Sequence, residues 1–119
     1  MEFDSTRPIY LQIIDVIKKQ IIRGELKPGD KVLSQRDFAE KIRVNPNTVQ
    51  RAYKEMESMS ILETIRGQGT FICNRPEMLK EIKAEMANEI LTTFISDMRS
   101  LGFETDEIRD IVNSSLKGE

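Results

Sequence analysis

Residues 47 to 54 mix amide, hydroxyl and cationic side chains with apolar ones, a combination suited to recognition by hydrogen bonds. Val49, Ala52, Tyr53 and Met56 recur at helical spacing and predict one buried stripe on a helix. The side chains between them then face away from the core. Asparagine and glutamine can make two hydrogen bonds to adenine, arginine can do the same to guanine, and threonine can contact a phosphate or a thymine methyl group. The residues that this face offers to the edges of DNA bases are Asn47, Thr48, Gln50, Arg51 and Lys54.

Two predicted helix starts offer further polar groups. Ser34 and Arg36 lie at the first start, where free backbone amides and a cation suit a phosphate. Asn45 comes just before Pro46 at the second start and is also a candidate contact. Ser34 and Asn45 are both preferred helix caps, so capping alone is an alternative explanation for each of them.

The stretch from residue 66 to residue 69 predicts the tip of a β-hairpin, because it joins two segments rich in branched and aromatic residues. Gly67 and Gly69 lack side chains, so this tip is narrow. Gln68 is then placed to reach into or beside a DNA minor groove, while Arg66 pairs with a phosphate. A simpler explanation is that the turn itself requires the glycines. The polar side chains of residues 47 to 54 also have a simpler explanation, which is that they form a helix surface exposed to solvent.

The composition argues against catalysis and against metal binding. The chain of 119 residues has no histidine, no tryptophan and a single cysteine, Cys73. The commonest general base is therefore absent, and one chain cannot build a zinc site from sulfur and imidazole ligands. Carboxylates such as Asp15, Asp37 and Glu40 are scattered at helix-surface spacings, with no recognisable pair of nucleophile and base. We expect neither an enzyme nor a bound metal or cofactor.

Charge is distributed unevenly along the chain. The net charge is −2, but residues 1–75 hold 13 basic and 10 acidic side chains, a balance of +3, whereas residues 76–119 hold 5 and 10, a balance of −5. Any contact with nucleic acid is therefore expected in the front part. No apolar run reaches the roughly 18 residues of a membrane span, and residues 1–7 lead into no export signal. These features predict a cytoplasmic protein.

Hydrophobic spacing, caps and turn residues predict a chain of helices interrupted by one hairpin. The expected helices of the front part span residues 8–23, 35–42 and 46–59, and the expected strands span residues 61–65 and 70–73. Lys27–Asp30 has the chemistry of a turn. A helix of about 25 residues then follows from near residue 79, and a last helix begins with Thr105 as its cap. The predicted fold is mainly α with a small β-hairpin wing: a winged helix-turn-helix followed by a two-helix tail.

The two tail helices carry more apolar surface than they can bury on each other. Only 44 residues follow Arg75, so their two apolar stripes need a further surface to pack on. A second copy of the chain is the simplest partner, and symmetric pairing would give a helical bundle. The alternative is that one stripe packs back on the first helix of the same chain. The candidates for a dimer interface are Leu79, Ile82, Met86, Ile90, Phe94, Ile111 and Val112.

Four motifs occur in order along the front part: Gly24–Asp30 (GELKPGD), Ser34–Arg36 (SQR), Val44–Tyr53 (VNPNTVQRAY) and Arg66–Phe71 (RGQGTF). Together they resemble the amino-terminal domain of GntR-type bacterial transcription regulators over about residues 7–75. With so short a tail, the chain is most similar to the YtrA subfamily, whose carboxyl-terminal part is two helices used for dimerisation.

This resemblance implies a DNA-binding domain over residues 7–75 and a dimerisation region over residues 76–119. It implies that Arg36, Asn47, Thr48 and Gln50 contact operator DNA, with Gly67–Gly69 at the wing tip. The sequence departs from the family pattern at Leu33, Gln35 and Ser60, where proline, glutamate and glycine are usual. None of these departures removes an expected DNA contact. The large effector-binding domain of other GntR branches is absent from this sequence, so their ligand mechanism cannot be carried over to it, and the small-molecule effector is unknown.

We therefore expect a homodimeric repressor that binds a palindromic operator of double-stranded DNA near its own promoter. The subfamily resemblance suggests a transporter operon as the target. The alternative is a winged helix that serves as a protein–protein interaction module without specific DNA binding.

Overall fold

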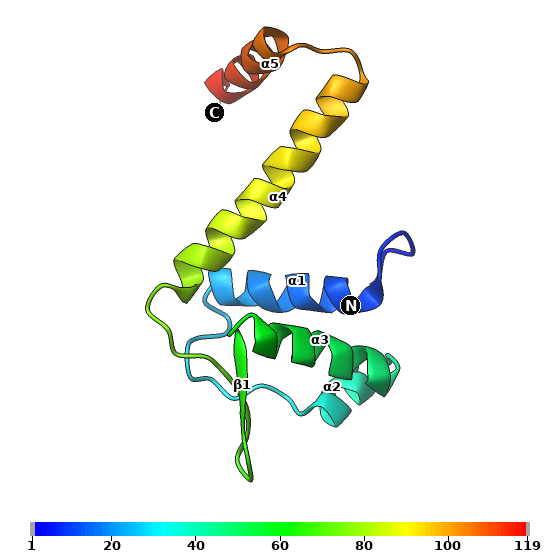
Figure 1. The fold of residues 1–119 in the computed structure, drawn as a ribbon, viewed down its shortest axis with the longest axis vertical. Coiled ribbons are helices and arrows are strands. Elements are labelled where there is room, and N and C mark those ends of the chain that lie inside the picture. The colour runs from blue at the N-terminus through cyan, green and yellow to red at the C-terminus, as the bar shows by residue number, and fades with distance from the viewer. Residues whose placement is uncertain (1, 119) are drawn as a thin grey trace. The chain divides into compact units, whose positions relative to one another are not determined.

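The computed structural model describes residues 2–118 of the chain. Within that range the protein has five helices and one antiparallel hairpin (Figure 1). This confirms the predicted fold class, mainly α with a small β-hairpin wing. In chain order the elements are α1 (Ile9–Ile22), α2 (Gln35–Ile42), α3 (Pro46–Ser58), β1 (Leu62–Ile65), β2 (Gly69–Ile72), α4 (Met78–Ser100) and α5 (Thr105–Lys117).

The chain divides into two compact units, Met1–Ile82 and Lys83–Glu119. The first unit therefore contains α1 to β2 and the first turn of α4, and the second contains the rest of α4 with α5. Within residues 2–118, no helix combines the length and the apolar character that crossing a membrane requires.

Local signals define the helix-turn-helix formed by α2 and α3. The Ser34 hydroxyl oxygen accepts a hydrogen bond from the third backbone amide of α2 at 3.1 Å, and the Asn45 side-chain oxygen accepts one from the second amide of α3 at 2.8 Å. Both caps satisfy amides that a helix start leaves free. Pro46 is the first residue of α3, where its missing N–H has no partner to lose. Arg43, in the left-handed region at φ 56°, ends α2 and turns the chain.

The core of the first unit lies between α1 and the helix-turn-helix. The predicted stripe of α3 is at most 1% exposed, and the Phe38 ring of α2 meets the Tyr53 ring edge-on at 5.9 Å. The Tyr53 hydroxyl donates a hydrogen bond to the Leu33 carbonyl at 2.6 Å, which ties α3 to the segment that leads into α2. The buried isoleucines of α1 are Ile13, Ile14, Ile17 and Ile21.

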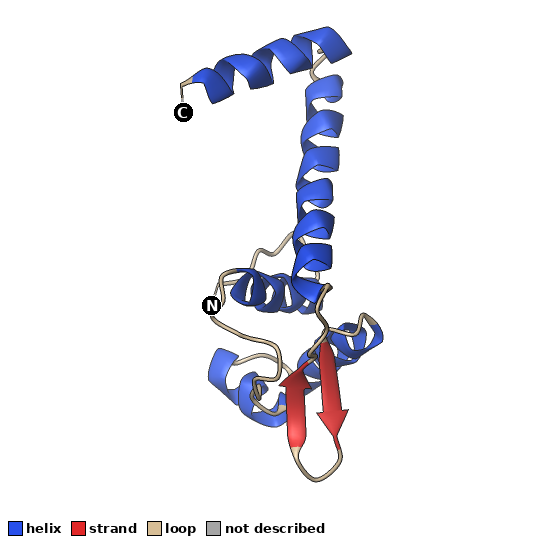
Figure 2. Ribbon diagram, turned by 90° about the vertical axis from the view of Figure 1, so that its left-hand side faces the viewer, coloured by secondary structure: helices blue, strands red, loops and turns tan. Residues whose placement is uncertain are grey.

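The wing consists of β1, β2 and the loop between them, residues 62–72. Leu62 pairs with Ile72 at its base and Ile65 pairs with Gly69 at its tip, which leaves only residues 66–68 in the loop (Figure 2). The Gln68 amide closes that loop by donating to the Ile65 carbonyl at 2.9 Å.

Residues 29–32 lie along the free edge of β2 and form a third, shorter strip of the sheet. The Gly29 amide donates to the Ile72 carbonyl at 2.8 Å, and the Val32 amide donates to the Thr70 carbonyl at 2.9 Å. Lys31 pairs with Phe71 between them as an antiparallel bridge. The sequence predicts the turn before this strip but not the pairing, because the partner residues lie about 40 positions further along the chain.

The start of α5 differs from its prediction. Thr105 is the first helical residue, and the cap is Glu104. The Glu104 amide donates to the Glu107 carboxylate at 3.0 Å, and the Glu104 side chain faces the helix amides in return. The prediction that Thr105 caps this helix is therefore wrong. A pair of glutamates three positions apart can satisfy the free amides reciprocally, and this arrangement does not need the threonine hydroxyl.

The apolar stripes of α4 and α5 are largely uncovered in the second unit. Ile90 is 71% exposed and Leu116 is 64% exposed, whereas Ile108 is buried; Leu101, just after α4, is 73% exposed. Side chains of this kind seldom stay in water over several helical turns without a partner.

Candidate nucleic-acid interface

The exposed face of α3 carries the polar side chains that the sequence singles out. Asn47, Gln50 and Lys54 are exposed and Thr48 is half-buried, while the apolar stripe occupies the opposite side of the helix. Residues 47, 50 and 54 follow one another at intervals of three and four, so they lie on one face. The first turns of α3 therefore present two amides and a cation to the surroundings.

Arg51 is engaged within the chain. Its guanidinium carbon lies 3.9 Å from the centroid of the Tyr10 ring, and its Nη2 donates a hydrogen bond to the Tyr10 hydroxyl at 3.1 Å. A cation stacked on an aromatic face is held by the electron density of the ring. The sequence offers Arg51 as a free reader of bases, but this contact with α1 orients its side chain and limits its reach.

The start of α2 places Ser34 and Arg36 close together on the surface. The Ser34 oxygen accepts a hydrogen bond as a helix cap, so its hydroxyl hydrogen is still available to a ligand. Asn45 is similar, since its oxygen caps α3 and its amide nitrogen keeps two hydrogens to donate. Arg36 is exposed. Capping and contact with DNA are therefore compatible at both caps.

The wing tip has the narrow form that its glycines predict. Gly67 has φ of +80° and Gly69 has φ of +120°, both in the region that favours glycine. Arg66 and Gln68 are exposed in the tip loop. The tip thus combines a thin backbone with one cation and one amide.

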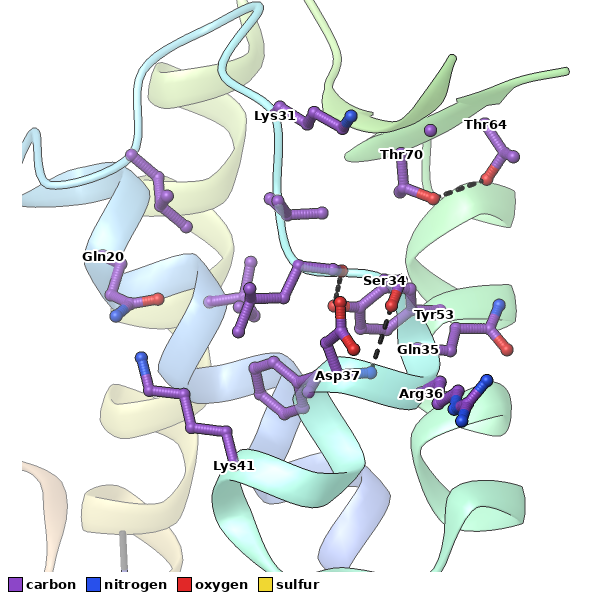
Figure 3. Close-up of a pocket in the computed structure, with 16 residues that line it drawn as sticks. Gln20, Lys31, Ser34, Gln35, Arg36, Asp37, Lys41, Tyr53, Thr64 and Thr70 are labelled. Carbon is purple, nitrogen blue, oxygen red and sulfur yellow. Dashed lines mark hydrogen bonds between the residues drawn. The ribbon is translucent and has the colours of Figure 1, made fainter. Parts of the chain in front are cut away.

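A groove with a volume of about 870 Å³ lies between the wing and the start of α2 (Figure 3). Its charged side chains are Lys31, Arg36 and Lys41 with a single carboxylate, Asp37. Thr70 and Thr64 lie on its wing side, with their hydroxyl oxygens 3.1 Å apart. Sequence reasoning missed Lys31 as a candidate, because only the pairing of residues 29–32 with β2 brings it to this place.

Two buried titratable groups of the first unit have raised pKa values. Burial raises the pKa of Tyr53 to about 12, and burial together with the Glu63 carboxylate raises the pKa of the Cys73 thiol. Both groups are therefore neutral at ordinary pH, and both belong to the core. Among residues 2–118, no three side chains of the types that bind metals gather closely enough to hold an ion.

The interface candidates in the tail differ in their exposure. Leu79, Ile90 and Ile111 are exposed, and Met86, Phe94 and Val112 are half-buried. Ile82 is only 2% exposed and belongs to the first unit, where Met78 of the same helix is also buried. Because its surface is already covered by its own chain, we remove Ile82 from the interface candidates.

The chain is similar to several known proteins over most of its length. Residues 9–72 match the family described as "Bacterial regulatory proteins, gntR family". The HTH-type transcriptional regulator YhcF of Bacillus subtilis is 44% identical over 98% of this chain and 97% of its own length. The HTH-type transcriptional repressor YtrA of the same organism is 44% identical over 96% of this chain and 91% of its own length. A solved GntR family transcriptional regulator from Listeria monocytogenes is 38% identical, with a TM-score of 0.82, covering 94% of this chain and 98% of that one.

Proposed function

Because the chain belongs to the gntR family of bacterial regulatory proteins and carries its DNA-binding winged helix, we propose that it is a dimeric repressor of transcription that binds a palindromic operator. The observation that carries this proposal is the exposed face of α3, where Asn47, Gln50 and Lys54 lie opposite the buried stripe. The proteins of this family are regulators, not enzymes, and this chain likewise acts by binding.

In this proposal the first turns of α3 enter the major groove, which is about 12 Å wide and accepts one helix. Asn47 and Gln50 hydrogen-bond base edges, with Thr48 and Lys54 beside them. Ser34, Arg36 and Asn45 contact the backbone near the two helix starts. The wing tip, residues 66–69, reaches the adjacent minor groove. Arg51 contacts DNA through the part of its guanidinium group that does not touch Tyr10.

Pairing of two chains through the tail explains the exposed apolar residues of α4 and α5. Six side chains on these helices form the proposed interface: Leu79, Met86, Ile90, Phe94, Ile111 and Val112. A two-fold dimer places two copies of α3 on a two-fold operator, and its affinity then combines the binding energies of both. The negative charge of residues 76–119 is consistent with a tail that stays away from DNA.

The similarity to a named repressor, YtrA, supports repression rather than activation. A repressor of this size acts most simply by occupying the promoter, and we place its operator near its own gene, with a transporter operon as the expected target. Such a protein works in the cytoplasm, where bacterial promoter DNA lies.

A gel-shift titration tests the proposal. The purified chain is titrated against the DNA upstream of its own gene and against a scrambled fragment of the same length and composition. We expect the upstream fragment to bind at least about 1,000-fold more tightly, as specific DNA-binding proteins do. Equal affinity for the two fragments would contradict sequence-specific binding.

A further inference from the structure

We infer that Lys31 builds a binding site for one phosphate of the DNA backbone, in the groove between the wing and the start of α2. This inference rests on the proposed function and adds a contact that the sequence motifs do not indicate. The Lys31 contact would raise the affinity for DNA and help to fix the position of the protein along the duplex. It would not distinguish base sequences, because a phosphate contact carries no sequence information.

The first support is the position of the Lys31 side chain. Lys31 pairs with Phe71 at the edge of the sheet, and its side chain then crosses the backbone of Gly69 in the neighbouring strand. A Cβ atom at position 69 would lie 2.7 Å from Lys31 Cε and 3.4 Å from its Nζ. Since real Cβ atoms do not approach other atoms at 2.7 Å, any other residue at position 69 would displace the end of the lysine side chain from this position. The absence of a side chain at Gly69 thus leaves room for the Lys31 side chain to lie across the wing.

The second support is the charge of the groove. Lys31, Arg36 and Lys41 line it together with one carboxylate, Asp37, so its net charge is positive. Across the described residues 2–118, neither Lys31 nor Arg36 has a salt-bridge partner. Lys31 and Arg36 are therefore available to bind an anion.

The third support comes from the geometry of duplex DNA. If α3 lies in a major groove and the wing tip lies in the adjacent minor groove, the sugar–phosphate strand that separates the two grooves must pass between them. The groove that Lys31 lines lies between the wing and the helix-turn-helix (Figure 3). The anion that this site meets is therefore a backbone phosphodiester of the bound operator.

The salt dependence of operator binding tests the inference, because each lost phosphate contact lowers the slope of log affinity against log salt concentration by about 0.9. We expect Lys31→Gln to lower this slope by about 1.8 per dimer, since each protomer loses one contact. Lys31→Arg keeps the charge and should retain the slope. Lys27→Gln is the matched control, because it makes the same charge change four residues earlier and does not line the groove.

Ethylation interference locates the contact. The wild-type protein should be blocked by ethylation of one particular phosphate in each half-site, and the Lys31→Gln protein should tolerate ethylation there. Thermal unfolding checks that each variant is folded.

A Lys31→Gln protein with the wild-type slope and the wild-type interference pattern would overturn the inference while leaving the proposed function intact. A wild-type protein that does not distinguish its upstream DNA from scrambled DNA would refute the proposed function, and the Lys31 site would fall with it.

Discussion

Replacing Gln50 with alanine separates recognition of bases from stability of the fold. Gln50 is exposed on α3, and its side chain has no hydrogen-bond partner in the part of the chain that the structure describes. Alanine also favours the helix more than glutamine does. The free energy of unfolding should therefore change by no more than about 0.5 kcal/mol, as is usual for surface substitutions.

The loss of operator affinity should be much larger. One good base contact is worth about 1–3 kcal/mol of discrimination. A dimer loses two such contacts, so the expected cost is roughly 2–6 kcal/mol, which corresponds to at least about a 30-fold rise in Kd because 1.4 kcal/mol is a factor of ten. The affinity for scrambled DNA should stay the same, since that binding depends on phosphate contacts.

Fluorescence anisotropy with a labelled upstream fragment measures both affinities, and urea unfolding measures the stability. Asn74→Ala is the matched control, because it deletes an exposed amide from the same unit outside the helix-turn-helix. If Gln50→Ala bound the upstream fragment as tightly as the wild type and the same held for Asn47→Ala, the exposed face of α3 would not read DNA. A winged helix that serves protein interaction would then account for the fold.

Three further outcomes follow from the structure. Ile90→Asp places a charge on a side chain that is 71% exposed in one chain, so sedimentation should show monomers with weakened operator binding; an unchanged dimer would exclude Ile90 from the interface. Ser34→Ala removes the cap of α2 and should cost about 1 kcal/mol in urea unfolding, whereas Ser34→Gly should cost only a few tenths; equal losses would argue against the cap. Burial raises the pKa of Tyr53 to about 12, above its unfolded value near 10, so its contribution to stability is complete below pH 10 and is lost as pH rises toward 12. Unfolding titrations of wild type and Tyr53→Phe should diverge in that window, and parallel curves would contradict this assignment.

The sequence predicts the elements of the front part well because their determinants are local. Ser34, Asn45 and Pro46 each act on backbone groups within three residues, and the buried stripe of α3 follows from helical spacing alone. Gly67 and Gly69 mark the wing tip for the same reason, since the turn itself requires their conformations. Such signals need no knowledge of the tertiary fold.

Contacts between distant segments could not be predicted in this way. The stacking of Arg51 on Tyr10 joins positions 41 residues apart, and the pairing of Lys31 with Phe71 joins a loop to a strand. Neither contact leaves a periodic pattern in the sequence. Both change the candidate interface, because the first anchors an expected base reader and the second brings an unexpected cation to the groove.

Hydroxyl-radical footprinting of the wild-type protein on its upstream DNA tests the account most directly. Two copies of α3 held in a two-fold dimer should protect two half-sites related by symmetry, with centres one helical turn of about 34–36 Å, or a multiple of it, apart. Protection of a single asymmetric site, or uniform protection with no defined position, would contradict it.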